Sequence, residues 1–211
     1  MTKKELFFKL KEKLDMLYPK VHCTLDYNSP FELLVATMLA AQCTDARVNI
    51  VTKQMYKKYN TPYDFAKLSI EEIENEIKST GFYHNKAKNI KKCSQQLIEL
   101  YNGEVPEDME ALVNLAGVGR KTANVVRGEI FGKPAVVIDT HAKRLAKRMG
   151  LTKSDDPVKI EFELKKFIPE EYQFDFCHSL VFHGREICKA QKPLCKQCTL
   201  NEICKYKNKQ V

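Results

Sequence analysis

The stretch LAGVGRKTANVV, residues 115–126, places two glycines around one valine and leads directly into a basic pair and an apolar run. Arg120 and Lys121 follow Gly119 at once, and apolar residues then recur at helical spacing. Glycine adopts turn conformations that other residues disfavour, and it lets backbone N–H groups come close to a bound group. A turn of this kind suits close packing or contact with a phosphate.

Two nucleotide-binding motifs do not fit this turn. A P-loop has glycine immediately before its lysine, whereas Arg120 stands before Lys121 here. A dinucleotide fingerprint has a third glycine where Thr122 stands, and it follows a strand rather than a helix. The helical patterns on both sides instead predict a helix–turn–helix whose backbone amides, helped by the positive end of the second helix, contact a phosphate.

The charge of the chain favours a polyanionic partner. Its 211 residues carry a formal net charge of +8, and the pI is near 9.0. Lys and Arg outnumber acids eight to two over 117–149 and seven to two over 184–211. These segments predict a nucleic-acid face. No apolar run approaches the ~20 residues of a membrane span, and the N-terminus lacks the apolar core of a secretion signal.

Hydrophobic periodicity predicts an all-α fold. Ser29 and Glu32 indicate a capping box at the start of one helix, and Ser69 and Glu72 indicate another. The segment PAVVID, 134–139, reads as a buried extended connection that ends in a helix cap at Asp139. The side chains expected on inner helix faces are Phe31, Leu34, Val35, Met38, Leu39, Val48, Val51, Met55, Ile70, Ile73 and Ile77.

Four cysteines near the C-terminus predict a metal centre. Cys188, Cys195, Cys198 and Cys204 are spaced C-x6-C-x2-C-x5-C. A disulfide framework is disfavoured in a large chain without a secretion signal. Structural zinc and a [4Fe–4S] cluster both use four thiolates, and this spacing alone matches neither the usual zinc pairs nor the ferredoxin patterns. Scattered Cys23, Cys43, Cys93 and Cys177 receive no role, although the last two fall at helical core positions.

The turn, followed by VVIDTH at 136–141, resembles the helix-hairpin-helix and Gly/Pro…Asp signature of DNA base-excision glycosylases. Within that superfamily the chain is most similar to the endonuclease III family, over nearly its whole length. The resemblance implies that Lys121 is the nucleophile and that Asp139, 18 residues later, assists it.

These two residue types suit base removal. An amine can attack the sugar carbon as the base leaves, and the resulting Schiff base eases the next proton removal and strand cleavage. Asp139 can accept a proton and stabilise positive charge on the sugar. We expect the helix N-terminus, Arg120 and partial burial to favour the neutral amine of Lys121. Taken alone, Lys121 could instead be a phosphate contact and Asp139 a plain helix cap.

The resemblance also implies further site residues. The same cysteine spacing in iron–sulfur members of the family implies a [4Fe–4S] cluster on Cys188, Cys195, Cys198 and Cys204, which would fix the loop that carries two lysines against DNA. Gln42 matches the glutamine that enters the space of the flipped base, and Phe82 matches the residue that presses on the opposite strand, often a smaller aliphatic residue in relatives. The expected DNA contacts are Gln42, Phe82, Gly117, Val118, Gly119, Arg120, His141, Lys189 and Lys192.

The implied layout has two helical domains with an active-site cleft between them. Residues 22–133 would form a six-helix domain that ends in the hairpin, and residues 1–21 with 134–211 would form the cluster domain. The implied activity is that of a bifunctional DNA N-glycosylase and abasic-site lyase of base-excision repair. It would act on oxidised pyrimidines or abasic sites in duplex DNA, as a cytoplasmic, nucleoid-associated monomer without a membrane partner.

Three alternatives stay open at this point. Adenine-mismatch and mismatch-thymine glycosylases share the fold but lack the lysine at this turn, so Lys121 argues against such a monofunctional enzyme. A non-catalytic iron–sulfur DNA-binding module would tolerate loss of both Lys121 and Asp139. A basic iron–sulfur electron carrier would leave those two residues unexplained.

Overall fold

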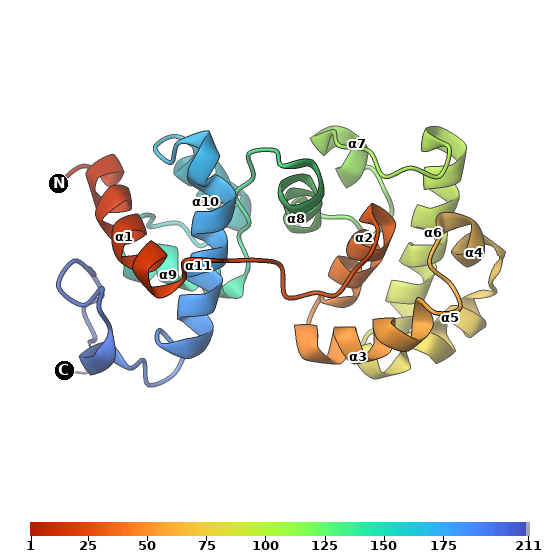
Figure 1. Cartoon of the computed structure of the whole chain (residues 1–211), viewed down its shortest axis with the longest axis horizontal. Coiled ribbons are helices and arrows are strands. Elements are labelled where there is room, and N and C mark those ends of the chain that lie inside the picture. Colours follow the sequence, from red (N-terminus) through yellow and green to blue (C-terminus); the bar gives the residue numbers. More distant parts are fainter. Residues whose placement is uncertain (210–211) are drawn as a thin grey trace. The chain divides into compact units, whose positions relative to one another are not determined.

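The computed structural model describes residues 1–209 and confirms the all-α prediction, since the described residues contain helices and no strand (Figure 1). They form two compact units. One unit contains Met1–His22 and the chain from Pro134 onward, and the other contains Cys23–Lys133. These bounds differ by one residue from the predicted domain bounds. No described helix is long and apolar enough to cross a membrane.

The unit of Cys23–Lys133 is built from short capped helices around one long helix. α4 and α5 both pack on α6, and α2 and α7 pack on α8. Its elements are α2 (Pro30–Leu39), α3 (Asp45–Met55), α4 (Pro62–Lys67), α5 (Ile70–Ile77), the 3₁₀ turn η1 (Lys78–Thr80), α6 (Tyr83–Tyr101), α7 (Met109–Val113) and α8 (Arg120–Phe131).

Helix α2 is the core helix of this unit. Every residue from Phe31 to Leu39 is buried, which confirms the predicted stripe and extends it around the helix. The predicted capping box at its start is only half correct. Ser29 Oγ accepts from Glu32 N at 3.1 Å, but the Glu32 carboxylate accepts from Asn28 N at 2.6 Å instead of reaching back to Ser29. Glu32 is buried, and its side chain accepts hydrogen bonds from both the backbone and the side-chain amide of Asn28, so its polar atoms are not left without partners.

Other helix predictions hold with two exceptions. The reciprocal cap of Ser69 and Glu72 is confirmed at the start of α5, and Thr44 caps α3. Ile70 was predicted to face inward but is exposed, because it occupies the first helical turn, ahead of the buried face formed by Ile73 and Ile77. Val51 on α3 is only half-buried. Helix α4 was not predicted, since six residues are too few to show a helical period.

The second unit packs α11 (Gln173–Glu186) against both α9 (Thr140–Arg148) and α1 (Lys3–Leu17), with α10 (Pro157–Lys165) nearby in sequence. Two short 3₁₀ turns, η2 (Glu170–Tyr172) and η3 (Cys195–Gln197), complete its elements. Ala135–Ile138 are buried without forming a strand, and Asp139 caps α9, as predicted for this connection. Cys93 in α6 and Cys177 in α11 are core residues, which is also as predicted.

Candidate functional site

The glycine turn lies between α7 and α8, and its two glycines have different tasks. Gly117 has a φ of 75°, in the left-handed region that favours glycine. A Cβ there would meet Asn89 Cβ at 2.7 Å and Met38 Cε at 2.9 Å. Gly119 has an ordinary φ of −92°, and nothing lies within 4 Å of where its Cβ would be. Gly117 is therefore required by the fold. At Gly119, neither the backbone conformation nor the packing within its own unit requires a glycine.

The turn is held in place by α6. Gln96 Oε1 accepts from Ala116 N at 2.7 Å, and Gln96 Nε2 donates to Asn114 O at 3.3 Å. Val118 is buried and its N–H donates to Leu115 O, so this side chain points into the protein rather than toward a ligand. The surface presented by the turn thus consists of the backbone at Gly117 and Gly119, which are both exposed.

Lys121 stands in the first turn of α8. Gly119 caps this helix without a side chain, so no capping group covers the positive end of the helix. The partial burial expected for Lys121 is not found, because its side chain is exposed. The chain reverses into α8 with residues 122–126 buried, and Lys121 therefore lies on the outward face just before the helix enters the core.

Gln42 and Phe82 line the same hollow, although they are 40 positions apart in the chain. This hollow, of about 250 Å³, is bounded by Met38, Ala41, Gln42, Phe82, Asn85, Lys86, Asn89 and Gly117. Gln42 and Phe82 are both exposed, and both have left-handed backbone, with φ of 54° and 50°. Such backbone is strained for residues other than glycine and is concentrated at functional positions. The hollow that holds these two predicted contacts also reaches the glycine turn.

Asp139 and His141 begin α9 in the other unit. Asp139 Oδ1 accepts from Ala142 N at 2.7 Å as the helix cap, which leaves the second carboxylate oxygen outside the cap. Burial lowers the pKa of His141, and neighbouring Arg144 and Arg185 lower it further, while Asp139 raises it. His141 Nδ1 lies 3.2 Å from Arg144 Nη2. His141 is thus a neutral ring near pH 7, with one nitrogen oriented by an arginine.

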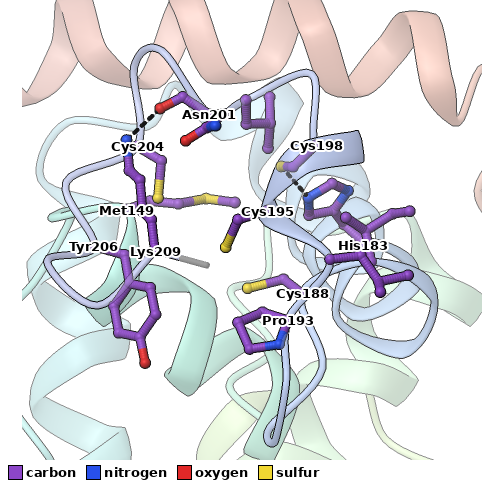
Figure 2. Close-up of a pocket in the computed structure, with 13 residues that line it drawn as sticks. Met149, His183, Cys188, Pro193, Cys195, Cys198, Asn201, Cys204, Tyr206 and Lys209 are labelled. Atoms are coloured by element: carbon purple, nitrogen blue, oxygen red, sulfur yellow. Dashed lines mark hydrogen bonds between the residues drawn. The ribbon is translucent and has the colours of Figure 1, made fainter. Parts of the chain in front are cut away.

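The four C-terminal cysteines gather around one small cavity of about 20 Å³ (Figure 2). All four line it and none forms a disulfide. The other lining side chains include Met149, Ile187, Leu194 and Leu200, so the surroundings are largely apolar. Burial raises the pKa of Cys198 and of Cys204, and the neighbouring thiols raise both further. Four crowded thiols of this kind become stable thiolates together only when positive charge lies between them.

Two side chains that the sequence analysis did not single out contact these cysteines. Arg148 Nη1 lies 3.3 Å from Cys188 Sγ and donates to Lys189 O at 2.7 Å, while Nη2 donates to Ala190 O at 2.9 Å. Buried His183 places Nε2 3.3 Å from Cys198 Sγ (Figure 2), and burial lowers the pKa of this histidine to about 4. Arg148 precedes Cys188 by 40 positions in the chain, and His183 precedes it by five, so neither residue type nor spacing predicted that both would contact the cysteines.

The predicted phosphate contacts in the cysteine loop are exposed. Lys189 and Lys192 both have exposed side chains, and Lys192 has a left-handed φ of 48°. The backbone of Lys189 is fixed by the bond to Arg148. A second basic surface in the same unit is a hollow of about 620 Å³, lined by Thr140, Lys143, Arg144, Lys147, Arg148, Asp155, Lys205, Tyr206 and Lys207. The unit that carries the cysteines therefore offers fixed positive charge to a polyanion.

Comparison with protein families shows that the chain belongs to a superfamily of DNA repair proteins. The model of a family described as "HhH-GPD superfamily base excision DNA repair protein" matches residues 35–170, which include the glycine turn and Asp139. A solved structure of a thermostable thymine-DNA glycosylase has the same fold, with a TM-score of 0.83 at 24% identity, over 97% of this chain and 96% of that one.

More similar proteins identify the family within this superfamily. Endonuclease III of Bacillus subtilis is 48% identical over 92% of this chain and 89% of the relative, and that of Escherichia coli is 44% identical over 88% of each. A non-covalent endonuclease III–DNA complex superposes with a TM-score of 0.92 at 47% identity, over 97% of this chain and 95% of that one. A trapped covalent endonuclease III–DNA intermediate matches equally well, with a TM-score of 0.92. The chain belongs to the endonuclease III family.

Proposed function

We propose that this chain is a bifunctional DNA glycosylase and abasic-site lyase that removes oxidised pyrimidines from duplex DNA. The observation that carries the proposal is Lys121, an exposed amine in the first turn of α8, directly after a turn whose outer glycine leaves room for a phosphate. A covalent DNA intermediate has been trapped in a relative of almost the same fold. An amine nucleophile accounts for such an intermediate.

Lys121 and Asp139 have different roles in the proposed reaction. The neutral amine of Lys121 attacks the sugar C1′ as the bond to the damaged base breaks, and the base takes the electron pair. Asp139 accepts a proton from the attacking amine and stabilises positive charge on the sugar. The C1′–O4′ bond then breaks, O4′ takes up a proton as a hydroxyl, and C1′ is left as an imine on Lys121. Loss of a proton from C2′ then expels the 3′ phosphate, and water releases the enzyme from the cleaved strand.

Base removal requires the target nucleotide to leave the helical stack. We assign Gln42 to the space that the base vacates and Phe82 to the opposite strand. Support for this assignment comes from their shared hollow and from the left-handed backbone at both positions. Backbone N–H groups at Gly117 and Gly119, with Arg120, His141, Lys189 and Lys192, would contact phosphate oxygens, the usual way in which proteins set their register on DNA.

We propose that the four cysteines hold a [4Fe–4S] cluster. They are free cysteines around one largely apolar cavity, and the mutual repulsion of four thiolates there would require a compensating positive charge. When bound, the cluster would supply a cross-link that closes the loop from Cys188 to Cys204. Arg148 would then hold the backbone of Lys189 and Ala190 beside it. We further propose that the protein acts as a monomer on chromosomal DNA in the cytoplasm.

The test is borohydride trapping on duplex DNA that contains one oxidised pyrimidine. The native protein should form a covalent adduct and Lys121→Gln should form none, while the variant still binds the duplex. Lys133→Gln is the control, because Lys133 lies near the far end of α8 and pairs with Glu107 at 3.2 Å. Equal trapping by Lys121→Gln would remove Lys121 as the nucleophile. Base release without trapping by the native protein would favour a monofunctional glycosylase.

A further inference from the structure

A lysine is buried beneath the hollow that Gln42 and Phe82 share. Lys86 belongs to α6 and is only 7% exposed, although it carries an amine. Burying an ammonium group without partners is strongly unfavourable, so each buried lysine must be compensated by its contacts. Burial lowers the pKa of Lys86. Lys86 has no part in the proposed DNA contacts or in the proposed chemistry.

The contacts of Lys86 join two separate segments. Its Nζ donates to Leu39 O at 2.8 Å and to Thr80 O at 2.9 Å. Leu39 is the last residue of α2, and Thr80 is the last residue of η1. Carbonyls at helix ends lack partners within the helix and carry partial negative charge, so one ammonium group can satisfy both ends.

The two segments joined in this way carry the two strained residues. Gln42 follows Leu39 by three positions, and Phe82 follows Thr80 by two. The backbone N–H of Lys86 also donates to Phe82 O at 3.2 Å. Left-handed backbone at a residue other than glycine persists only where the surroundings hold it. Lys86 therefore contacts the segment before Gln42 and the segment before Phe82. It also contacts the Phe82 carbonyl itself.

We propose that Lys86 is a positioning residue that holds Gln42 and Phe82 at a fixed separation, so that both strands of the DNA are contacted together when the damaged base is extruded. This inference rests on the proposed function. It assigns Lys86 no contact with the reacting sugar. Loss of its ammonium group should therefore impair base extrusion while leaving imine chemistry at an already abasic sugar intact.

Lys91 provides a matched control on the same helix. Its Nζ also donates to two carbonyls at a helix end, those of Ala66 and Leu68 at the end of α4, but these lie outside the hollow. Lys91→Met and Lys86→Met therefore remove the same chemical group and the same kind of carbonyl contact. Only the second change acts on the segments that carry Gln42 and Phe82.

The experiment compares these variants in the full-length protein by three readouts. These are the rate of base release from a duplex with one oxidised pyrimidine, the rate of cleavage at a preformed abasic site, and the fluorescence of a purine analogue opposite the lesion. Lys86→Met should slow base release by about tenfold, the effect of losing hydrogen bonds from a charged donor, and should weaken the fluorescence change. Cleavage at the abasic site should change less than about twofold, and Lys91→Met should resemble the native protein in all three.

The results of these measurements either support or overturn the positioning role of Lys86. Equal slowing of both reactions by Lys86→Met, in protein that melts like the native one, would overturn the positioning role, as would equal effects of Lys86→Met and Lys91→Met. If Lys86→Met does not fold, Lys86→Gln keeps an uncharged amide donor on a shorter side chain and should show the same selective loss in weaker form. Gln42→Ala and Phe82→Ala test the underlying assignment separately. If neither alters the fluorescence change, the proposed insertion roles fail, whatever Lys86 does.

Discussion

The backbone of Gly117 passes so close to Asn89 that a Cβ at position 117 would lie 2.7 Å from the Asn89 Cβ. This contact joins the glycine turn to the middle of α6, the helix whose start carries Phe82 and Lys86. The turn that precedes Lys121 and the hollow that holds Gln42 therefore share one rigid support. Changes at this contact should affect folding, whereas changes on the outer side of the turn should affect DNA binding.

Gly117→Ala should destabilise the protein by about 1–3 kcal/mol, because the alanine Cβ meets Asn89 and Met38 and the left-handed φ becomes strained. Urea unfolding followed by circular dichroism measures this change. Gly119→Ala is the matched control, with open space and an ordinary φ, and its free energy of unfolding should change by less than about 0.5 kcal/mol. The Gly119 variant should instead bind duplex DNA more weakly. Equal destabilisation by the two alanines would contradict the different tasks assigned to the glycines.

Lys192 combines an exposed charge with a left-handed backbone. Lys192→Gly removes the charge and relieves the backbone strain, so the fold should be unchanged or stabilised by up to about 1 kcal/mol. If Lys192 neutralises one phosphate, the slope of log binding constant against log salt concentration should become shallower by about 0.9. Filter binding or fluorescence anisotropy at several salt concentrations measures the slope. An unchanged slope would place Lys192 outside the DNA contact.

Arg148 anchors the start of the cysteine loop. Its guanidinium contacts Cys188 Sγ and the carbonyls of Lys189 and Ala190, and it stacks 4.5 Å from the ring centre of Tyr206. A lysine cannot reproduce this planar set of donors. With the proposed [4Fe–4S] cluster bound, Arg148→Lys should therefore lose the visible absorbance of the cluster faster in air than the native protein does. Lys147→Met, on the same helix and paired with Asp155, should keep the native rate. Identical rates for Arg148→Lys and the native protein would disprove the anchor.

The buried thiols of Cys93 and Cys177 should resist alkylation in the folded protein. Burial raises the pKa of each to about 12, so few thiolates form at pH 8. Mass spectrometry after iodoacetamide treatment should find both unmodified in native protein and modified in urea. Modification of either one in the native protein would contradict its burial.

The same thiols should make the fold less stable in alkali. A group whose pKa is raised in the folded state stabilises the fold below its unfolded pKa, near 9, and loses this contribution as the pH rises toward the folded pKa. Each thiol should therefore lower the free energy of unfolding by about 1.4 kcal/mol per pH unit between pH 9 and 12. Cys93→Ala should show a shallower decline than the native protein. Parallel declines would contradict the assignment.

Several features followed from the sequence because they depend on local chemistry. Helix starts at Ser69 and Asp139 are recognisable because their side chains cap nearby amides. The capping box predicted at Ser29 is only half formed, because the Glu32 carboxylate accepts a hydrogen bond from Asn28 N instead of Ser29 N. Which of these bonds forms depends on how Glu32 is buried. Helix α4 and the exposure of Ile70 were likewise outside the reach of periodicity, since each depends on what a short segment packs against.

In the candidate site, too, some residues could be predicted from the sequence and others only from the tertiary structure. Lys121, Asp139 and the four cysteines could be predicted as site residues because each belongs to a short motif that resembles one in a known family. The distinction between Gly117 and Gly119 could not, because it depends on Asn89 and Met38 approaching from other helices. Lys86 reads in the sequence as one more surface lysine of a basic chain. Only the tertiary structure, by bringing the ends of α2 and η1 to one amine, makes it a buried support for Gln42 and Phe82.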